Sequence, residues 1–253
     1  MKGLTFAGRV GKEIMRDPLS YIFCIGFPVI MLIIMSIIDS SIPAQANMTV
    51  FHIENLAPGI AYFGLTFVML FTSIQVSKDR TTALLLRLYA SPMKPYEYMV
   101  GYTVPVCVLG IAQMLICFTA SYLVALMRGV SFSLPSILLS MFLLVPSMLM
   151  FVGTGILFGS AVSEKAAPGM CSIIISAVGM IGGIWMDVDG IGGTIKKVAE
   201  MLPFYHGVKL SRLPFGDGLQ GAGVHLLWTY AFAIIFYVLA VRVFTSKMKK
   251  DLK

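Results

Sequence analysis

Six long windows without a charged residue constrain this chain more than any other feature. The windows cover residues 18–38, 55–77, 98–127, 129–163, 166–186 and 218–241. They contain one histidine, His225, in the last window. A helix that crosses a bilayer needs about 20 predominantly apolar residues. The pattern therefore predicts an all-α membrane protein with six transmembrane helices, near residues 20–38, 57–77, 98–122, 137–160, 169–187 and 223–243.

The composition supports a single membrane domain over residues 1–253. Apolar residues make up 58% of the chain and charged residues only 12%, about half of the charged fraction of a soluble domain. These values exclude a disordered chain, a nucleic-acid-binding domain and an ordinary soluble enzyme. The four cysteines lie inside apolar runs without metal-site spacing, so we expect no bound metal.

The distribution of basic residues predicts the orientation. Segments 1–18, 78–97, 163–168 and 242–253 hold 14 of the 19 lysines and arginines. Because basic residues concentrate in cytoplasmic loops, both termini are expected in the cytoplasm of a multi-pass protein of the cytoplasmic membrane. The net charge of +7 then reflects topology, and no nucleic-acid partner is expected.

Two segments of the predicted cytoplasmic side have amphipathic patterns. Residues 2–16 place polar and apolar side chains on opposite faces, which predicts an N-terminal interfacial helix within 1–18. The loop 78–95 contains a second helix, with a leucine arc beside two arginines, that is closed by a Ser-Pro pair. Such a surface suits docking to a cytoplasmic partner, and a helix held only by lipid is the alternative. The docking residues are Asp79, Arg80, Leu84, Leu85, Arg87, Leu88, Ser91 and Pro92.

The segment 187–221 is long for a loop between two spans. It predicts short helices over 195–202 and 204–213 that turn back toward the outer side of the bilayer. Arg212 is expected at the membrane edge, paired with Glu200 or Asp217. Two GxxxG pairs, Gly155 with Gly159 and Gly179 with Gly183, predict close helix packing.

Several kinds of chemistry have no sequence signature here. The chain lacks a P-loop, an HExxH motif and a GxSxG motif. The predicted spans also lack the buried charges that ion-coupled transporters usually carry. The energy for transport is then expected from a separate protein. An ion-coupled secondary transporter or channel, and a membrane-embedded enzyme, are the alternatives.

Together these features resemble the membrane subunits of ABC exporters of the type-2 permease group. The resemblance covers the whole chain, including Arg16-Asp17-Pro18 after the interfacial helix and the loop 78–95, which is similar to the family's coupling helix. The sharpest motif is similar to the family signature and its outer gate: Gly182, Gly183, Pro203, Phe204, His206 and Arg212. Where relatives often have a proline after the glycine pair, this chain has Trp185-Met186-Asp187.

The resemblance implies a transport subunit that is not itself an enzyme and binds no cofactor. Separate ABC ATPase subunits would bind ATP and Mg, and a second copy or a related permease would complete a dimer within membrane lipids. The cargo would be a hydrophobic or amphipathic compound, such as a drug, an antimicrobial peptide or a lipid-like molecule, that moves outward. Candidate path-lining residues, chosen by position, are Thr66, Met69, Ser73, Ile173, Ser176 and Met180.

Overall fold

The computed structural model describes residues 2–43, 48–81, 93–216 and 218–251. These residues form helices and no strand. The helices are α1 (Lys2–Arg16), α2 (Pro18–Tyr21), the π-helical turn η1 (Ile22–Gly26), α3 (Phe27–Ser41), α4 (Ile53–Thr81), α6 (Pro95–Met127), α7 (Leu134–Ala161), α8 (Ala167–Ile181), α9 (Val188–Ile191), α10 (Gly193–Glu200), α11 (Pro203–Arg212), the 3-10 turn η3 (Leu213–Phe215) and α12 (Ala222–Asp251).

Five helical stretches of the described chain are long and apolar enough to cross a membrane. They are Pro18–Ser41, Ile53–Arg80, Tyr96–Met127, Leu134–Ala161 and Ala222–Lys247, and each contains one predicted span. The remaining prediction, 169–187, differs from the structure, because α8 has only 15 residues and ends at Ile181. The glycine pair that follows breaks the helix, since Gly183 adopts a φ of +82°.

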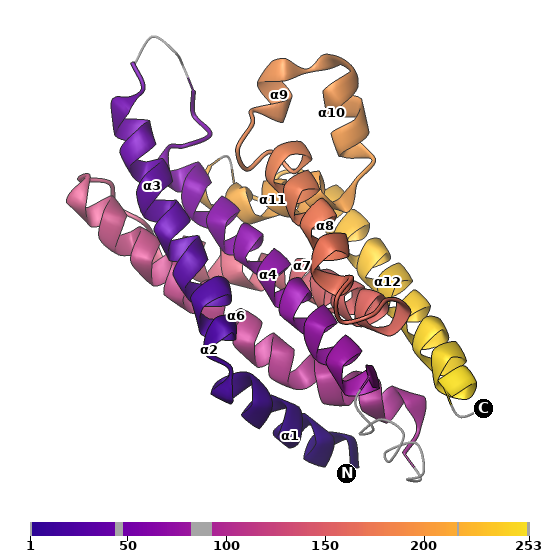
Figure 1. Cartoon of the computed structure of the whole chain (residues 1–253). Helices are drawn as coiled ribbons and strands as arrows, with labels where there is room; N and C mark the ends of the chain where they lie inside the picture. The colour runs from indigo at the N-terminus through magenta and orange to yellow at the C-terminus, as the bar shows by residue number, and fades with distance from the viewer. Residues whose placement is uncertain (1, 44–47, 82–92, 217, 252–253) are drawn as a thin grey trace.

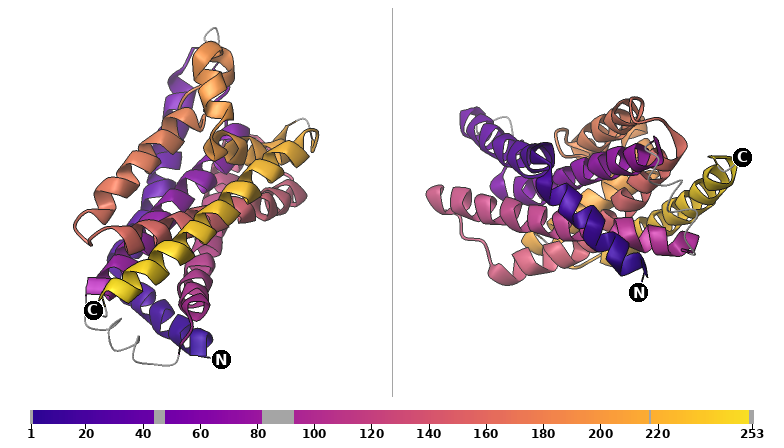
Figure 2. Two further views of the ribbon diagram at one scale, coloured as in Figure 1. Left: turned by 90° about the vertical axis from the view of Figure 1, so that its right-hand side faces the viewer. Right: turned by 60° about the horizontal axis from the view of Figure 1, so that its bottom comes forward.

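The bundle has two distinct ends (Figures 1 and 2). Helix α1 lies across the end where α12 also finishes, whereas α9 and α10 lie at the opposite end. We call these the terminal end and the distal end. Helices α4 and α7 form the centre, with 78% and 67% of their most apolar stretches buried, against 17% for α12. Every long helix therefore packs directly or indirectly on α4 and α7.

Small residues bring α4 and α7 into close contact. A Cβ on Gly155 would lie 2.5 Å from the main-chain oxygen of Met69, and one on Gly159 would lie 2.6 Å from that of Ser73. The first GxxxG pair therefore lets two backbones touch, as the sequence predicts. The second pair does not act this way: Gly179 accommodates Trp185, and Gly183 lies beyond the end of α8. That prediction is wrong, because the helix stops before a second small residue can face a neighbour.

Candidate functional site: polar clusters at the two ends of the bundle

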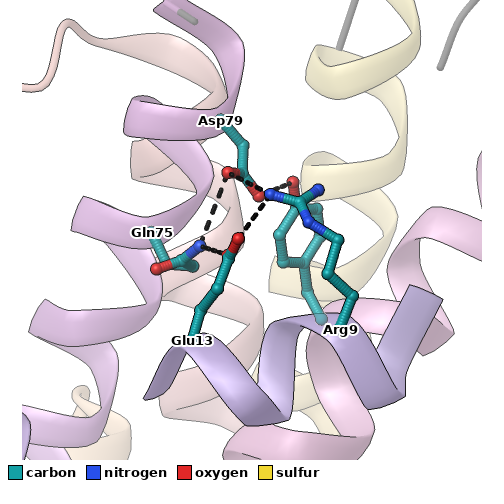
Figure 3. Close-up of polar contacts among 5 residues, drawn as sticks. Arg9, Glu13, Gln75 and Asp79 are labelled. Carbon is teal, nitrogen blue, oxygen red and sulfur yellow. Dashed lines mark hydrogen bonds and ion pairs between the residues drawn. The ribbon is translucent and has the colours of Figure 1, made fainter. Parts of the chain in front are cut away.

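A partly buried polar network joins three helices at the terminal end (Figure 3). We call it the terminal cluster; it consists of Arg9, Glu13, Gln75, Asp79 and Tyr102. Arg9 Nη2 lies 2.6 Å from Glu13 Oε1 and 3.7 Å from Asp79 Oδ1. Gln75 Nε2 donates to Glu13 Oε2 at 2.7 Å, and Tyr102 Oη donates to Asp79 Oδ2 at 2.9 Å. The network thus connects α1 and α6 to the last turn of α4.

Local helix geometry sets up this cluster. Arg9 and Glu13, like Gln75 and Asp79, are four residues apart, so each pair shares one face of its helix. Phe6 fixes α1 against α6, because its ring occupies the space over Gly101, where a Cβ would lie 2.2 Å from Phe6 Cδ1. The Phe6 ring also meets Tyr102 edge-on, with ring centroids 5.1 Å apart.

Asp79 and Arg80 do not begin a separate docking helix, because α4 continues through them to Thr81. Asp79 is buried, with 3% of its surface exposed. Arg80 donates to the main-chain oxygen of Ser160, next to the C-terminus of α7, where a cation is favourable. The other predicted docking residues lie outside the described residues: Leu84, Leu85, Arg87, Leu88, Ser91 and Pro92.

A second cluster at the distal end centres on Arg212, at the C-terminus of α11. Arg212 Nε donates to the main-chain oxygen of Asn55 at 3.0 Å, and Nη1 donates to that of Gly183 at 2.9 Å. One side chain therefore ties α11 to the start of α4 and to the break after α8. Burial lowers the pKa of Arg212 to about 10, so the guanidinium stays charged at neutral pH.

These contacts correct the predicted carboxylate pair of Arg212. Within the described part of the chain, its hydrogen-bond acceptors are main-chain oxygens and not Glu200; Asp217 lies outside that part. The physical reason is the glycine break after α8, which turns a carbonyl toward α11. Residue spacing cannot reveal such an acceptor.

The other signature residues gather around the same helix. Pro203 starts α11 at its first position, where its missing N–H has no cost. The ring of Phe204 stacks on Phe151 of α7, with centroids 6.3 Å apart. A Cβ on Gly182 would lie 3.6 Å from the Cβ of Phe204. The structure thus brings the glycine pair and the α11 residues together.

His206 forms a paired contact that the sequence does not predict. Its Nε2 lies 2.8 Å from the main-chain oxygen of Glu200, and its Nδ1 lies 2.8 Å from Nδ1 of His225 on α12. A carbonyl only accepts, so Nε2 of His206 carries a proton. In the neutral pair, Nδ1 of His206 then accepts the proton of His225. Trp228 stacks on the His206 ring at a centroid distance of 5.0 Å.

Asp189 is a second residue that sequence reasoning misses. Its carboxylate binds Lys196 of α10 at 2.9 Å, and on α11 it binds Lys209 and accepts a hydrogen bond from Tyr205 at 2.8 Å. Burial alone would raise its pKa, but the hydrogen bonds from Lys209, Lys196 and Tyr205 outweigh burial and lower the pKa to about 2. One carboxylate therefore holds α9, α10 and α11 together.

The six candidate path residues fall into two groups. Thr66, Met69 and Ser73 are fully buried on α4, two of them directly against the close α4–α7 contact. Ile173, Ser176 and Met180 share an exposed face of α8. Only the α8 group reaches the surface of the chain, because the α4 group lies inside the bundle, with Met69 and Ser73 at the contact with α7.

Comparison with known families identifies the family of the chain. A model of the family described as ABC-2 family transporter protein matches residues 41–242, most of the chain. No curated protein matches it. The matched region contains four of the six predicted spans and all but the last residue of a fifth, together with the terminal end of α4 and the distal signature around α11. The chain belongs to the ABC-2 transporter family and is a multi-pass membrane protein.

Proposed function

We propose that the chain is the membrane subunit of an ATP-driven ABC exporter. It works with separate ATPase subunits, which bind ATP and Mg, and with a second permease copy or a related permease. The cargo is a hydrophobic or amphipathic compound that leaves through the cytoplasmic membrane. The chain itself catalyses no reaction and binds no cofactor.

Six passes of a single domain, residues 1–253, fit the positions of the two ends. The start and end of the described chain lie at the same end of the bundle (Figures 1 and 2), which supports an even number of passes. We assign these passes to the five long helices and to α8. The terminal end carries most of the basic residues, so it faces the cytoplasm. α9, α10 and α11 then belong to an outer re-entrant segment, 187–221, that forms the outer gate.

The observation that carries the proposal is the terminal cluster. Asp79 lies in the last turn of α4, immediately before the segment that contains the predicted coupling helix. It binds Tyr102 of α6 directly and Arg9 of α1 as an ion pair. A push on that segment by an ATPase therefore acts on three helices together. This is the connection that a coupling device needs.

The exposed face of α8 is the proposed path surface. Ile173 and Met180 are 67% and 55% exposed, and Ser176 lies between them on the same face. A partner permease would cover this face and enclose a path lined by flexible apolar side chains, which suit varied hydrophobic cargo. Thr66, Met69 and Ser73 would join the path only if α4 and α7 separated during transport.

Transport in inverted vesicles tests the proposal. The chain is co-expressed with a candidate ABC ATPase subunit, and uptake of a fluorescent hydrophobic dye is followed with and without ATP. We expect ATP-dependent uptake that Leu85→Asp abolishes, because an unpaired charge in an apolar docking groove prevents assembly or coupling. Arg87→Ala should weaken coupling mildly and in a salt-dependent way.

Asp79→Asn tests the terminal cluster in the same assay. We expect ATP hydrolysis to continue while uptake falls several-fold, because the last turn of α4 is then less firmly tied to α1. Glu164→Gln, on an exposed link between α7 and α8, is the matched control and should transport normally. Uptake that needs a proton gradient and no ATPase would instead establish a secondary transporter.

A further inference from the structure

A cavity of about 500 Å3 lies at the terminal end, where α1 turns into α2. Its walls come from α1, α2, α4 and α6. Asp17 and Pro18 form the turn, and Asp17 caps α2 because its Oδ1 accepts a hydrogen bond from the main-chain N–H of Leu19 at 3.2 Å. The cavity therefore sits where a surface helix meets the first membrane-spanning segment.

The polarity of the cavity changes along one wall. On α4, Val68 and Phe71 line its apolar part, whereas Gln75 and Lys78 line its polar part. Val68 and Lys78 are about 15 Å apart along the helix axis, which is about half of the thickness of a bilayer's hydrocarbon core. The cavity thus matches the polarity profile of one leaflet, with its polar part at the surface.

Basic and acidic residues line the polar part in equal number, so an anion can bind there only to a basic side chain that has no protein partner. The three carboxylates that line the cavity already accept hydrogen bonds from the protein; they are Glu13, Asp17 and Asp79. Arg16, by contrast, is exposed in the last turn of α1 and makes no hydrogen bond or ion pair within the described chain. A guanidinium binds a phosphate group through two parallel hydrogen bonds.

We propose that this cavity binds one anionic phospholipid from the adjacent leaflet. The phosphate contacts Arg16 at the rim, beside Lys78. The first part of an acyl chain lies between Val68 and Phe71 of α4 and the α6 residues Val106 and Leu109. The bound lipid then joins α1 to α4 and α6 beside the terminal cluster. This site does not depend on the proposed export function.

Native mass spectrometry of the full-length protein tests this site. The protein is released from phosphatidylcholine nanodiscs that contain a minor fraction of phosphatidylglycerol, and the lipids that stay bound are counted. We expect one retained phosphatidylglycerol per chain. Arg16→Gln should weaken its retention about tenfold, as expected for a lost charge-assisted hydrogen bond.

Two further variants separate this site from general surface attraction. Lys12→Gln removes the same charge one turn earlier on α1, at an exposed position outside the cavity, and should retain the lipid normally. Leu109→Trp keeps every charge but fills the apolar part, and should also lose the lipid. The proposal fails if Lys12→Gln and Arg16→Gln have equal effects, if Leu109→Trp retains the lipid, or if the wild type shows no preference. Displacement by inorganic phosphate alone would indicate an ion site and also overturn it.

Discussion

The polar clusters at the two ends of the bundle differ in the atoms that accept their hydrogen bonds. In the terminal cluster, side chains of Arg9, Glu13, Gln75 and Tyr102 bind one another and Asp79. At the distal end, Arg212 donates to the main-chain oxygens of Asn55 and Gly183. A side-chain network can exchange partners when the helices move, whereas a carbonyl moves only with its own backbone.

This difference suggests different roles for the two ends. The terminal cluster is suited to transmit motion from a cytoplasmic partner, since its members are side chains that can exchange partners as the helices move. The distal cluster is suited to hold α4, α8 and α11 in one arrangement. The predictions below test this contrast, from the largest expected effect to the smallest.

Arg212→Ala should cause the largest loss of stability. Two hydrogen bonds from a charged donor are lost, one to Asn55 and one to Gly183, and such bonds contribute about 1.5–3 kcal/mol each. Arg212→Lys should recover only part of the loss, because one ammonium group replaces the fork of donors. The fraction of monodisperse protein after heating in detergent measures the effect. Lys197→Ala, at an exposed position of α10, is the control. If Arg212→Ala were as stable as the wild type, the contrast between the two ends would not hold.

Asp79→Ala should lower the free energy of unfolding less, by about 2 kcal/mol. It leaves the Tyr102 hydroxyl without this acceptor, whereas Arg9 and Gln75 still donate to Glu13. Asp79→Asn retains an oxygen for Tyr102 and should lose about half as much. The same heating assay applies, with Glu164→Ala as the exposed carboxylate control. A loss as large as that of Arg212→Ala would show that the terminal cluster is also rigid.

The contact between His206 and His225 should contribute about 1 kcal/mol of coupling. His206→Phe and His225→Phe each remove it, so the double variant should be more stable than the sum of the two single losses predicts. Heating curves of the four proteins give this coupling free energy. Additive losses would mean that α11 is held to α12 by Trp228 stacking and apolar packing alone.

Asp189 should give the smallest effect, and one that depends on pH. Its pKa of about 2 lies below the unfolded value of about 3.9. Its stabilising contribution is therefore complete above about pH 4 and is lost as the pH falls toward 2. Asp189→Asn should thus be less stable than the wild type at pH 7, and the difference should shrink at pH 3. An unchanged difference would show that the lysine contacts do not matter.

The two clusters also differ in how far the sequence predicts them. The distal signature is visible as Pro203, Phe204, His206 and Arg212 with the glycine pair, because a motif resemblance marks it. Its acceptors are not visible, since any residue supplies a carbonyl. The terminal cluster has no motif, although the spacing of Gln75 and Asp79 at the end of an apolar helix is a signal that could have located half of it.

The sequence by itself shows that the chain lies in lipid, where its long helices are and which segments carry the basic residues. Long windows without charge predict helices that span a membrane, and glycine and proline positions limit where those helices can end. Only the tertiary structure decides which residues of different helices come into contact. It places α7 against Met69 and Ser73, and it lets Arg80 donate to a carbonyl of α7. It also ends α8 at Ile181, so that the Gly183 carbonyl accepts a hydrogen bond from Arg212. Such contacts join residues 29 to 157 positions apart, and hydrophobic periodicity describes only neighbours on one helix.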